Sequence, residues 1–278
     1  MTGFFSSTRP GEKVDLHGRE LELPALYFRD DLFMLFLTAD PGKVKALMPS
    51  DNLYPVLMPR GRTLLGVACF NYIETSLGPY GEVGLVVPVV YGKQPSKFLP
   101  LLQESRYPNF GTLVLHLPVT NTLARDGGRM GWGYTKFVAD MRFTMTSEYM
   151  EVRMAEEDRH ILTARVERRG FTKRDTKPVV TYTVLNEELI KTVIPQVGTC
   201  RVCVRPKNSF IQWGDHEVAR GMMDLDLSPR PLMTRYYMER SAILPLGKVV
   251  EKNVRPLDGY FGCDRDGVHE VKYMEQKE

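Results

Sequence analysis

A single lysine, Lys136, has sequence neighbours that could make it chemically reactive. It ends the run Gly-Arg-Met-Gly-Trp-Gly-Tyr-Thr-Lys at 128–136, which contains three glycines and two large aromatic residues, and Phe137 follows it. Only a neutral amine attacks a carbonyl, and a lysine with the ordinary pKa of about 10.4 is less than about 0.1 % neutral at pH 7. Lowering that pKa to about 7 requires roughly 4–5 kcal/mol of destabilisation of the charged form, which burial or a nearby cation can supply. The aromatic residues offer apolar surroundings for this lysine, and Arg129 offers the cation.

The same residues also fit a less specific interpretation, a glycine-rich turn that carries a solvated lysine. The turn is expected to lead directly into a strand at 137–143, where side chains alternate between two faces. If the strand already includes Lys136, that lysine shares a face with Asp140 and Arg142. A close Asp140 carboxylate would then raise the pKa of Lys136 and oppose its reactivity.

Other patterns that could carry chemistry are weaker. Cys200 and Cys203 have the spacing of a redox or half-zinc motif, but no second pair accompanies them, and in a strand they point to opposite faces, as ordinary thiols. The basic segment 165–177 could bind phosphates or lie at a subunit interface, although a solvated turn needs no partner. His116, between two leucines, fits a strand histidine. The sequence shows no nucleophile elbow, dinucleotide fingerprint or metal-ligand spacing, so we expect neither a metal nor a cofactor.

Composition restricts the class of protein. With 278 residues, of which 43 % are apolar and 10 % aromatic, the chain is typical of a folded globular protein. Its 37 basic and 34 acidic residues give a net charge of only +3, so nothing calls for a nucleic acid or an anionic membrane as partner. No apolar run approaches the about 18 residues that span a bilayer, and the N-terminus lacks the features of a signal peptide. We therefore expect a cytoplasmic protein.

The apolar pattern predicts a fold dominated by strands. Continuous apolar runs at 31–38 and 82–90 fit strands buried on both faces, and the alternation over 137–166 predicts an antiparallel meander. The fold class expected is mainly β with a few short helices (α+β), antiparallel and barrel-like. No composition break marks a linker, so we expect one domain over residues 1–278, with residues 1–11 as a flexible tail.

Short helices are expected at four places. The first is 42–48, where Asp40 serves as N-cap and Pro41 lies in the first turn. The others are 97–105, 120–125, just before the lysine motif, and 186–194.

The motif around Lys136 resembles the signature G-R-E-x-W-G-Y-P-K-K of the acetoacetate decarboxylase-like superfamily, in which the first lysine forms a Schiff base with the substrate ketone. Residues 78–82, Gly-Pro-Tyr-Gly-Glu, resemble the family's G-x-Y-x-E segment, which carries an active-site glutamate, and residues 40–49 resemble its early helix. The three segments agree in order and spacing. The resemblance implies a homo-oligomer of the acetoacetate decarboxylase-like fold with Lys136 and Glu82 as catalytic residues. It makes Arg29, Arg129, Tyr80, Trp132 and Tyr134 the expected substrate-binding residues.

The chain also departs from the family pattern. Met130 stands where the signature has its glutamate, and Phe137 replaces the second lysine, which leaves desolvation as the main route to a reactive amine. A second family glutamate falls at Val67. The family's substrate-binding arginine is matched to Arg29, although the alignment slips by one residue and places Asp30 opposite it.

These features predict a Schiff-base-forming lyase that acts on a small oxo acid. An acetoacetate decarboxylase-like decarboxylase of a β-keto acid, acting through an iminium on Lys136, is the first expectation. An aldolase or dehydratase that uses the same lysine through an enamine is the alternative. A non-catalytic member of the family that only binds a small molecule is a third possibility.

Overall fold

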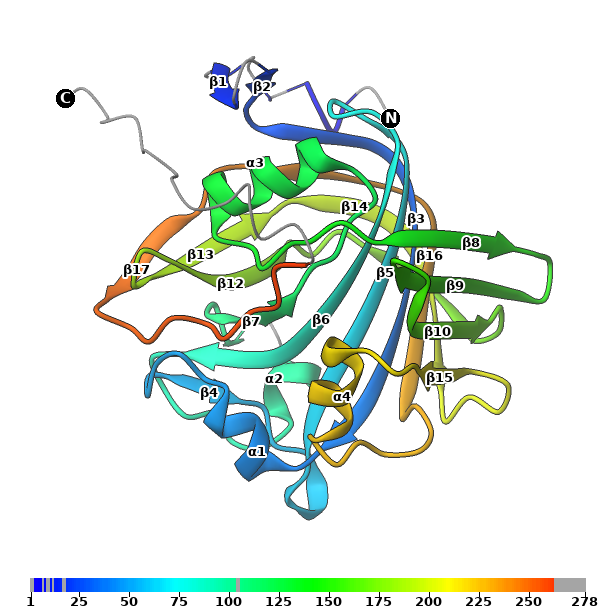
Figure 1. Ribbon diagram of the computed structural model, residues 1–278. Coiled ribbons are helices and arrows are strands. Elements are labelled where there is room, and N and C mark those ends of the chain that lie inside the picture. Colours follow the sequence, from blue (N-terminus) through cyan, green and yellow to red (C-terminus); the bar gives the residue numbers. More distant parts are fainter. Residues whose placement is uncertain are drawn as a thin grey trace.

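The computed structural model describes residues 3–6, 8, 11, 13–16, 19–103 and 106–262. These residues form a mainly β structure with a few short helices, as the sequence predicts (Figure 1). The expected N-terminal tail, residues 1–11, lies partly outside the described residues. None of the described helices is long and apolar enough to cross a lipid bilayer.

A large sheet of eleven strands forms the centre of the molecule. Its neighbours pair antiparallel, except for one parallel pair formed by β7 and β12. The described strands do not close into a ring, because β11 and β17 are the two ends of the sheet, so the expected barrel-like shape is present only in a loose sense. In spatial order the strands are β11 (Phe171–Asp175), β14 (Gln196–Val204), β16 (Met233–Leu244), β3 (Ala25–Ala39), β5 (Thr63–Thr75), β6 (Tyr80–Tyr91), β7 (Phe110–His116), β12 (Val179–Leu185), β13 (Glu188–Ile194) and β17 (Lys248–Lys252), and β4 (Leu53–Pro55) also pairs with β6.

The predicted meander forms a second, four-stranded sheet, in the order β15 (Phe210–Trp213), β10 (Arg159–Glu167), β9 (Tyr149–Glu156) and β8 (Asp140–Met145). It projects beside the large sheet in Figure 1, and the main hydrophobic core contains buried residues from both sheets. The short strands β1 (Lys13–Leu16) and β2 (Arg19–Glu22) pair only with each other.

The helices are short. The expected first helix is α1 (Pro41–Ala46), and its N-cap is Asp40, whose carboxylate accepts the Lys43 backbone N–H at 2.8 Å. The other named helices are α2 (Leu99–Leu102), α3 (Thr122–Trp132) and α4 (Glu217–Met223), and a 3-10 turn lies at Pro59–Gly61.

The glycine-rich stretch before Lys136 is a helix and not the expected turn. Helix α3 starts at the N-cap Asn121 and continues through Gly128 and Gly131 to Trp132. It ends where Gly133 adopts a left-handed conformation with φ of 67°. Its packing across the large sheet outweighs the weak helix propensity of glycine (Figure 1).

The prediction of a helix at 186–194 is also wrong. Strands β12 and β13 form a hairpin there, and Asn186 and Glu187 make its tip with φ of 51° and 59°. Two consecutive left-handed residues are typical of a tight two-residue hairpin turn, which the apolar spacing alone does not reveal.

Two other sequence patterns lie on strands. Cys200 and Cys203 are free thiols on β14, the first buried and the second partly exposed, which confirms that they face opposite sides. Within the basic segment 165–177, residues 171–174 of β11 are exposed along one end of the large sheet.

Candidate active site

The segment that carries Lys136 is extended and runs beside residues 117–119. Leu117 donates its backbone N–H to the Thr135 carbonyl, and Val119 donates to the Phe137 carbonyl, each at 2.9 Å. In an extended segment neighbouring side chains point in opposite directions. Phe137 is therefore buried in the main core, whereas Lys136 points away from it.

Lys136 contacts Glu82 of β6 in the interior of the protein. The distance between Lys136 Nζ and Glu82 Oε2 is 2.6 Å, and the two residues are only 4 % and 6 % exposed. Removing two ions from water costs several kcal/mol for each, so a buried pair is weak evidence for stability and a recurrent feature of functional sites. The structure thus brings together the two residues expected to be catalytic, across 54 positions of sequence.

Gly128 makes room for the lysine. A Cβ atom at this position would lie 2.5 Å from Lys136 Cε and 2.6 Å from Cδ, well inside normal contact distance. The glycine in the middle of α3 therefore allows the lysine stem to pass against the helix backbone. Asp140, the carboxylate that could have opposed reactivity of the lysine, is exposed on β8.

Four tyrosines surround the Lys136–Glu82 pair. Tyr72 donates its hydroxyl proton to Glu82 Oε1 at 3.0 Å, so each carboxylate oxygen has a partner. The hydroxyls of Tyr27 and Tyr80 are 2.9 Å apart, and the Tyr134 ring lies 5.6 Å from Lys136 Nζ. Burial raises the pKa of all four hydroxyls, and the Glu82 carboxylate raises it further. These hydroxyls stay protonated at neutral pH and can act as hydrogen-bond donors.

A small cavity adjoins the lysine between α3 and the large sheet. Its volume is about 20 Å³, enough for about one water molecule, so a substrate can enter only if it is small and side chains shift. Its walls are aliphatic and aromatic, and Lys136 is the one cation among the described residues that line it. Tyr27, Tyr80, Leu123, Trp132 and Tyr134 are among the residues of its wall.

Three of the five expected substrate-binding residues line this cavity, namely Tyr80, Trp132 and Tyr134. Anchors outside it hold two of these rings in place: Trp132 donates its indole N–H to the Pro245 carbonyl at 2.7 Å, and the Tyr134 hydroxyl is 3.0 Å from Thr181 Oγ1. Their polar atoms are thus occupied, and their ring faces are available to a substrate.

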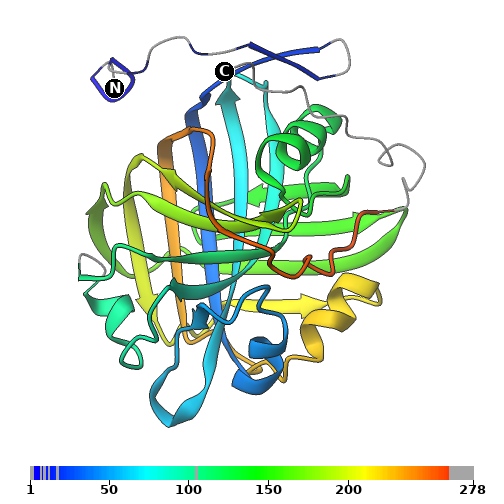
Figure 2. The ribbon, with the colours of Figure 1, turned by 90° about the vertical axis from the view of Figure 1, so that its left-hand side faces the viewer.

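The two expected arginines do not line the cavity. Arg29 is exposed on β3, where irregular pairing with β5 turns its side chain outward. Arg129 is buried, but its guanidinium binds main-chain carbonyls, those of Lys136 and of Phe261, the latter at 2.8 Å. Arg129 therefore ties the lysine segment to residues 254–262, which run below α3 in Figure 2.

Several residues of this site were not expected from the sequence. Tyr27 and Tyr72 have no motif of their own, although strand pairing of Phe70 with Glu82 places Tyr72 on the face of Glu82. Val67 lies three positions before Phe70 on β5, so its side chain points to the opposite face of the strand, into the main core. A side chain at position 67 therefore does not point toward Glu82. Asp30, next to Arg29, is also buried near the site. In the sequence, the one-residue slip that places Asp30 opposite the family's substrate-binding arginine is the feature that points to it.

Comparisons with known proteins agree with this architecture. A sequence profile of the family described as acetoacetate decarboxylase (ADC) matches residues 17–252, whereas no curated protein matches the chain. The structure of acetoacetate decarboxylase from Legionella pneumophila subsp. pneumophila str. Philadelphia 1 is similar with a TM-score of 0.63 at 17 % identity, over 88 % of this chain and 94 % of that one.

Two further solved structures share the fold at lower identity. An acetoacetate decarboxylase-like enzyme from Sphingomonas wittichii RW1 has a TM-score of 0.56 at 12 % identity, over 86 % of this chain and 95 % of that one. The enduracididine biosynthesis enzyme MppR, complexed with the condensation product of pyruvate and imidazole 4-carboxaldehyde, has a TM-score of 0.57 at 11 % identity, over 87 % and 97 %.

Proposed function

Since this chain belongs to the acetoacetate decarboxylase family, we propose that it is a Schiff-base-forming lyase that decarboxylates a small β-keto acid through an iminium on Lys136. The observation that carries the proposal is the buried contact of 2.6 Å between Lys136 Nζ and Glu82 Oε2, since Lys136 also lines the cavity. A neighbouring carboxylate stabilises an ammonium group, so the amine becomes a nucleophile only after its proton has passed to Glu82. The short contact places this proton acceptor within reach of the amine.

The proposed reaction starts with transfer of a proton from the Lys136 ammonium to Glu82. The neutral amine attacks the substrate ketone, and the resulting carbinolamine loses water, with Glu82 returning the proton, to give an iminium. The bond to the carboxylate then breaks, its electron pair moves into the iminium, and carbon dioxide leaves an enamine. Protonation of the enamine carbon and hydrolysis release the ketone and regenerate the lysine.

The tyrosines support the proton-transfer steps. Tyr72 holds Glu82 by its other oxygen and so fixes the carboxylate that faces the lysine. The Tyr27 and Tyr80 hydroxyls carry two protons, and their mutual hydrogen bond uses one. We assign the other to the substrate oxygen, where a donor stabilises the carbinolamine and the departing water.

The charges around the cavity favour decarboxylation over reactions of an α-oxo acid. An α-oxo acid keeps its carboxylate beside the iminium throughout and therefore needs a lasting cationic partner. The described arginines near the site are engaged elsewhere: Arg129 binds main-chain carbonyls, and Arg240 binds Asp30. A β-keto acid loses its carboxylate, and an apolar wall favours that loss because it stabilises a carboxylate poorly.

An aldolase or dehydratase that uses the same lysine is the second candidate. Its support is the similarity of fold to MppR, whose structure contains a condensation product of pyruvate. The same Lys136 iminium would then lose a proton to give an enamine that attacks an aldehyde, and no carbon dioxide would form.

Borohydride trapping tests the step that both reactions share. Protein incubated with acetoacetate, or with pyruvate and an aldehyde, is reduced with borohydride and analysed by intact-mass and peptide mass spectrometry, while carbon dioxide release is measured in parallel. Lys136→Arg is the matched control, because it keeps a cation beside Glu82 but forms no stable imine. An adduct on Lys136 with release of carbon dioxide supports the decarboxylase, and an adduct without it supports the second candidate. If no oxo acid in a broad panel gives an adduct, the chain is not a Schiff-base enzyme, and the binding protein becomes the better interpretation.

A further inference from the structure

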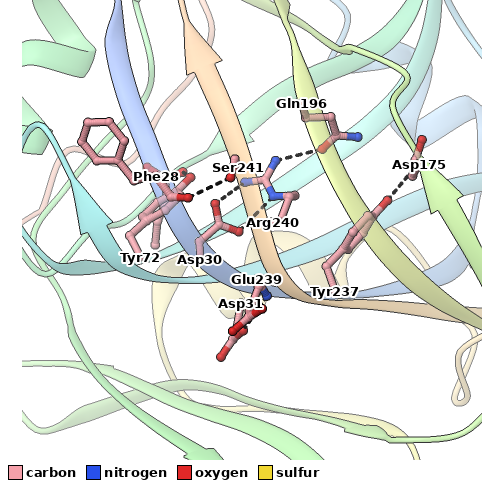
Figure 3. Close-up of polar contacts among 11 residues, drawn as sticks. Phe28, Asp30, Asp31, Tyr72, Asp175, Gln196, Tyr237, Glu239, Arg240 and Ser241 are labelled. Carbon is pink, nitrogen blue, oxygen red and sulfur yellow. Dashed lines mark hydrogen bonds and ion pairs between the residues drawn. The ribbon is translucent and has the colours of Figure 1, made fainter. Parts of the chain in front are cut away.

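A second buried ion pair lies beyond Tyr72, between Asp30 of β3 and Arg240 of β16. Arg240 donates from Nε to Asp30 Oδ1 at 2.9 Å and from Nη2 to Oδ2 at 3.0 Å, and its Nη1 donates to Gln196 at 2.9 Å (Figure 3). Asp30 is 0 % and Arg240 3 % exposed. Burial raises the pKa of Asp30, and the Arg240 guanidinium opposes this rise. The pKa of Arg240 is also raised, because the Asp30 carboxylate outweighs the effect of burial. The two parallel contacts between guanidinium and carboxylate have the geometry of a bidentate ion pair.

The backbone is distorted on both strands to bury this pair. Asp30 and Arg240 are cross-strand partners, and the β3–β16 register shifts on both sides of Arg240. The preceding residue, Glu239, has a φ of 59°, which is costly for a residue with a side chain. Gly198 on β14 provides the space, since a Cβ there would lie 3.2 Å from Arg240 Cγ. Bulges of this kind redirect side chains and are frequent beside active sites.

A chain of packed rings connects the pair to the candidate active site. The Arg240 guanidinium carbon is 5.2 Å from the centre of the Phe70 ring, and Phe70 stacks on Tyr72 at 5.3 Å with 14° between the planes. Tyr72 donates to Glu82, and Phe70 is the cross-strand partner of Glu82. A buried ion pair adds little to stability compared with apolar residues of the same volume. Stability alone therefore does not account for a pair that is buried at the cost of a distorted backbone.

We propose that Asp30 and Arg240 are positioning residues that hold Phe70 and Tyr72 against Glu82 and set the charge around the Lys136–Glu82 pair. This inference rests on the proposed function of Lys136. The titratable and charged groups around the Lys136–Glu82 pair are Tyr27 and Asp30 on β3, Tyr72 on β5, Tyr80 on β6 and Tyr134 before β8. Arg240 on β16 acts on two of them, Asp30 and Tyr72.

The test is the pH dependence with which acetic anhydride acetylates Lys136, measured by peptide mass spectrometry against the exposed Lys248 as internal reference. In Asp30→Asn the positive charge of Arg240 is no longer balanced, so the ammonium of Lys136 is less favourable and the labelling midpoint moves to lower pH. Arg240→Gln has the opposite effect and moves it to higher pH. Each shift is expected to be on the order of one pH unit, the effect of a unit charge about 10 Å away at an effective dielectric constant of about 20. The double variant returns to the wild-type midpoint.

Glu239→Gln is the matched control, because it removes an exposed charge next to Arg240 that solvent screens, and its midpoint should not move. Arg240→Gln leaves Asp30 without its counter-ion and can prevent folding, in which case Asp30→Asn and the double variant decide the outcome. A midpoint in Asp30→Asn equal to that of the wild type would overturn the proposal, as would a double variant that keeps the shift of Asp30→Asn. Acetylation requires no substrate, so these results are independent of whether borohydride traps an adduct.

Discussion

Replacing Gly128 by alanine should separate activity from stability. The new methyl group would lie 2.5 Å from Lys136 Cε and 2.6 Å from Cδ, whereas carbon atoms in contact are about 3.5–4.0 Å apart. The lysine stem must therefore move by about 1 Å away from α3. This movement would lengthen the 2.6 Å contact between Lys136 Nζ and Glu82 Oε2 beyond hydrogen-bond range.

The expected loss of rate is large and the expected change in stability is small. A misplacement of about 1 Å in a reacting group can reduce the rate by about 100-fold. Alanine gains about 1 kcal/mol over glycine in a helix interior, and overpacking costs about 1–3 kcal/mol, so the free energy of unfolding should stay within about 2 kcal/mol of the wild type.

The assay compares Gly128→Ala with Gly131→Ala. Gly131 lies in the same helix, but a Cβ there would meet only Leu246, at an ordinary 3.9 Å. Gly131→Ala should therefore raise the free energy of unfolding slightly and leave the rate unchanged. The measurements are urea unfolding, decarboxylation of acetoacetate and the yield of borohydride-trapped adduct on Lys136. If Gly128→Ala keeps a rate within about threefold of Gly131→Ala, the argued role of Gly128 is wrong.

Three further changes have defined outcomes. Tyr72→Phe removes the hydrogen bond to Glu82 and should lower the decarboxylation rate constant about 10- to 100-fold, as measured by steady-state kinetics. The free energy of unfolding in urea should change by only about 1 kcal/mol. Equal rates for Tyr72→Phe and the wild type would contradict this prediction. Burial lowers the pKa of His116 from 6.5 to about 4, and His216 adds to the effect. As the pH falls, the unfolded state therefore takes up a proton before the folded state does. The free energy of unfolding should decrease by up to about 3 kcal/mol between about pH 7 and pH 4. His116→Met should lack this component, and parallel pH profiles of urea unfolding for the two proteins would refute it. Leu123→Ala enlarges the cavity beside α3 and should raise kcat/KM for β-keto acids with longer apolar chains relative to acetoacetate; an unchanged ratio would show that Leu123 does not limit substrate size.

The sequence identified the elements whose side-chain pattern is local. The apolar runs at 31–38 and 82–90 predicted β3 and β6, because a strand covered on both faces needs apolar residues at every position. Asp40 and Pro41 predicted the start of α1 for an equally local reason, since an N-cap satisfies backbone groups within its own turn.

Local patterns failed where packing between distant segments decided the structure. The glycines around 128 suggest a turn when read alone, but α3 is held by the sheet beneath it, and Gly128 is small because Lys136 passes against it. The stretch at 186–194 has the apolar spacing of a helix, yet its pairing with β12 makes it a strand.

For the site itself, the sequence determined which residue could be the nucleophile and which carboxylate could serve it. The motif around Lys136 and the turn before Glu82 carry that information in a few adjacent residues. The tertiary structure decided what surrounds them. Arg29 points outward and Asp30 inward where the pairing of β3 with β5 is irregular on both sides of Arg29. Asp30 meets Arg240 across 210 positions of sequence. Register and bulges depend on the order of strands in the sheet, so the charge around the lysine is a property of the folded molecule.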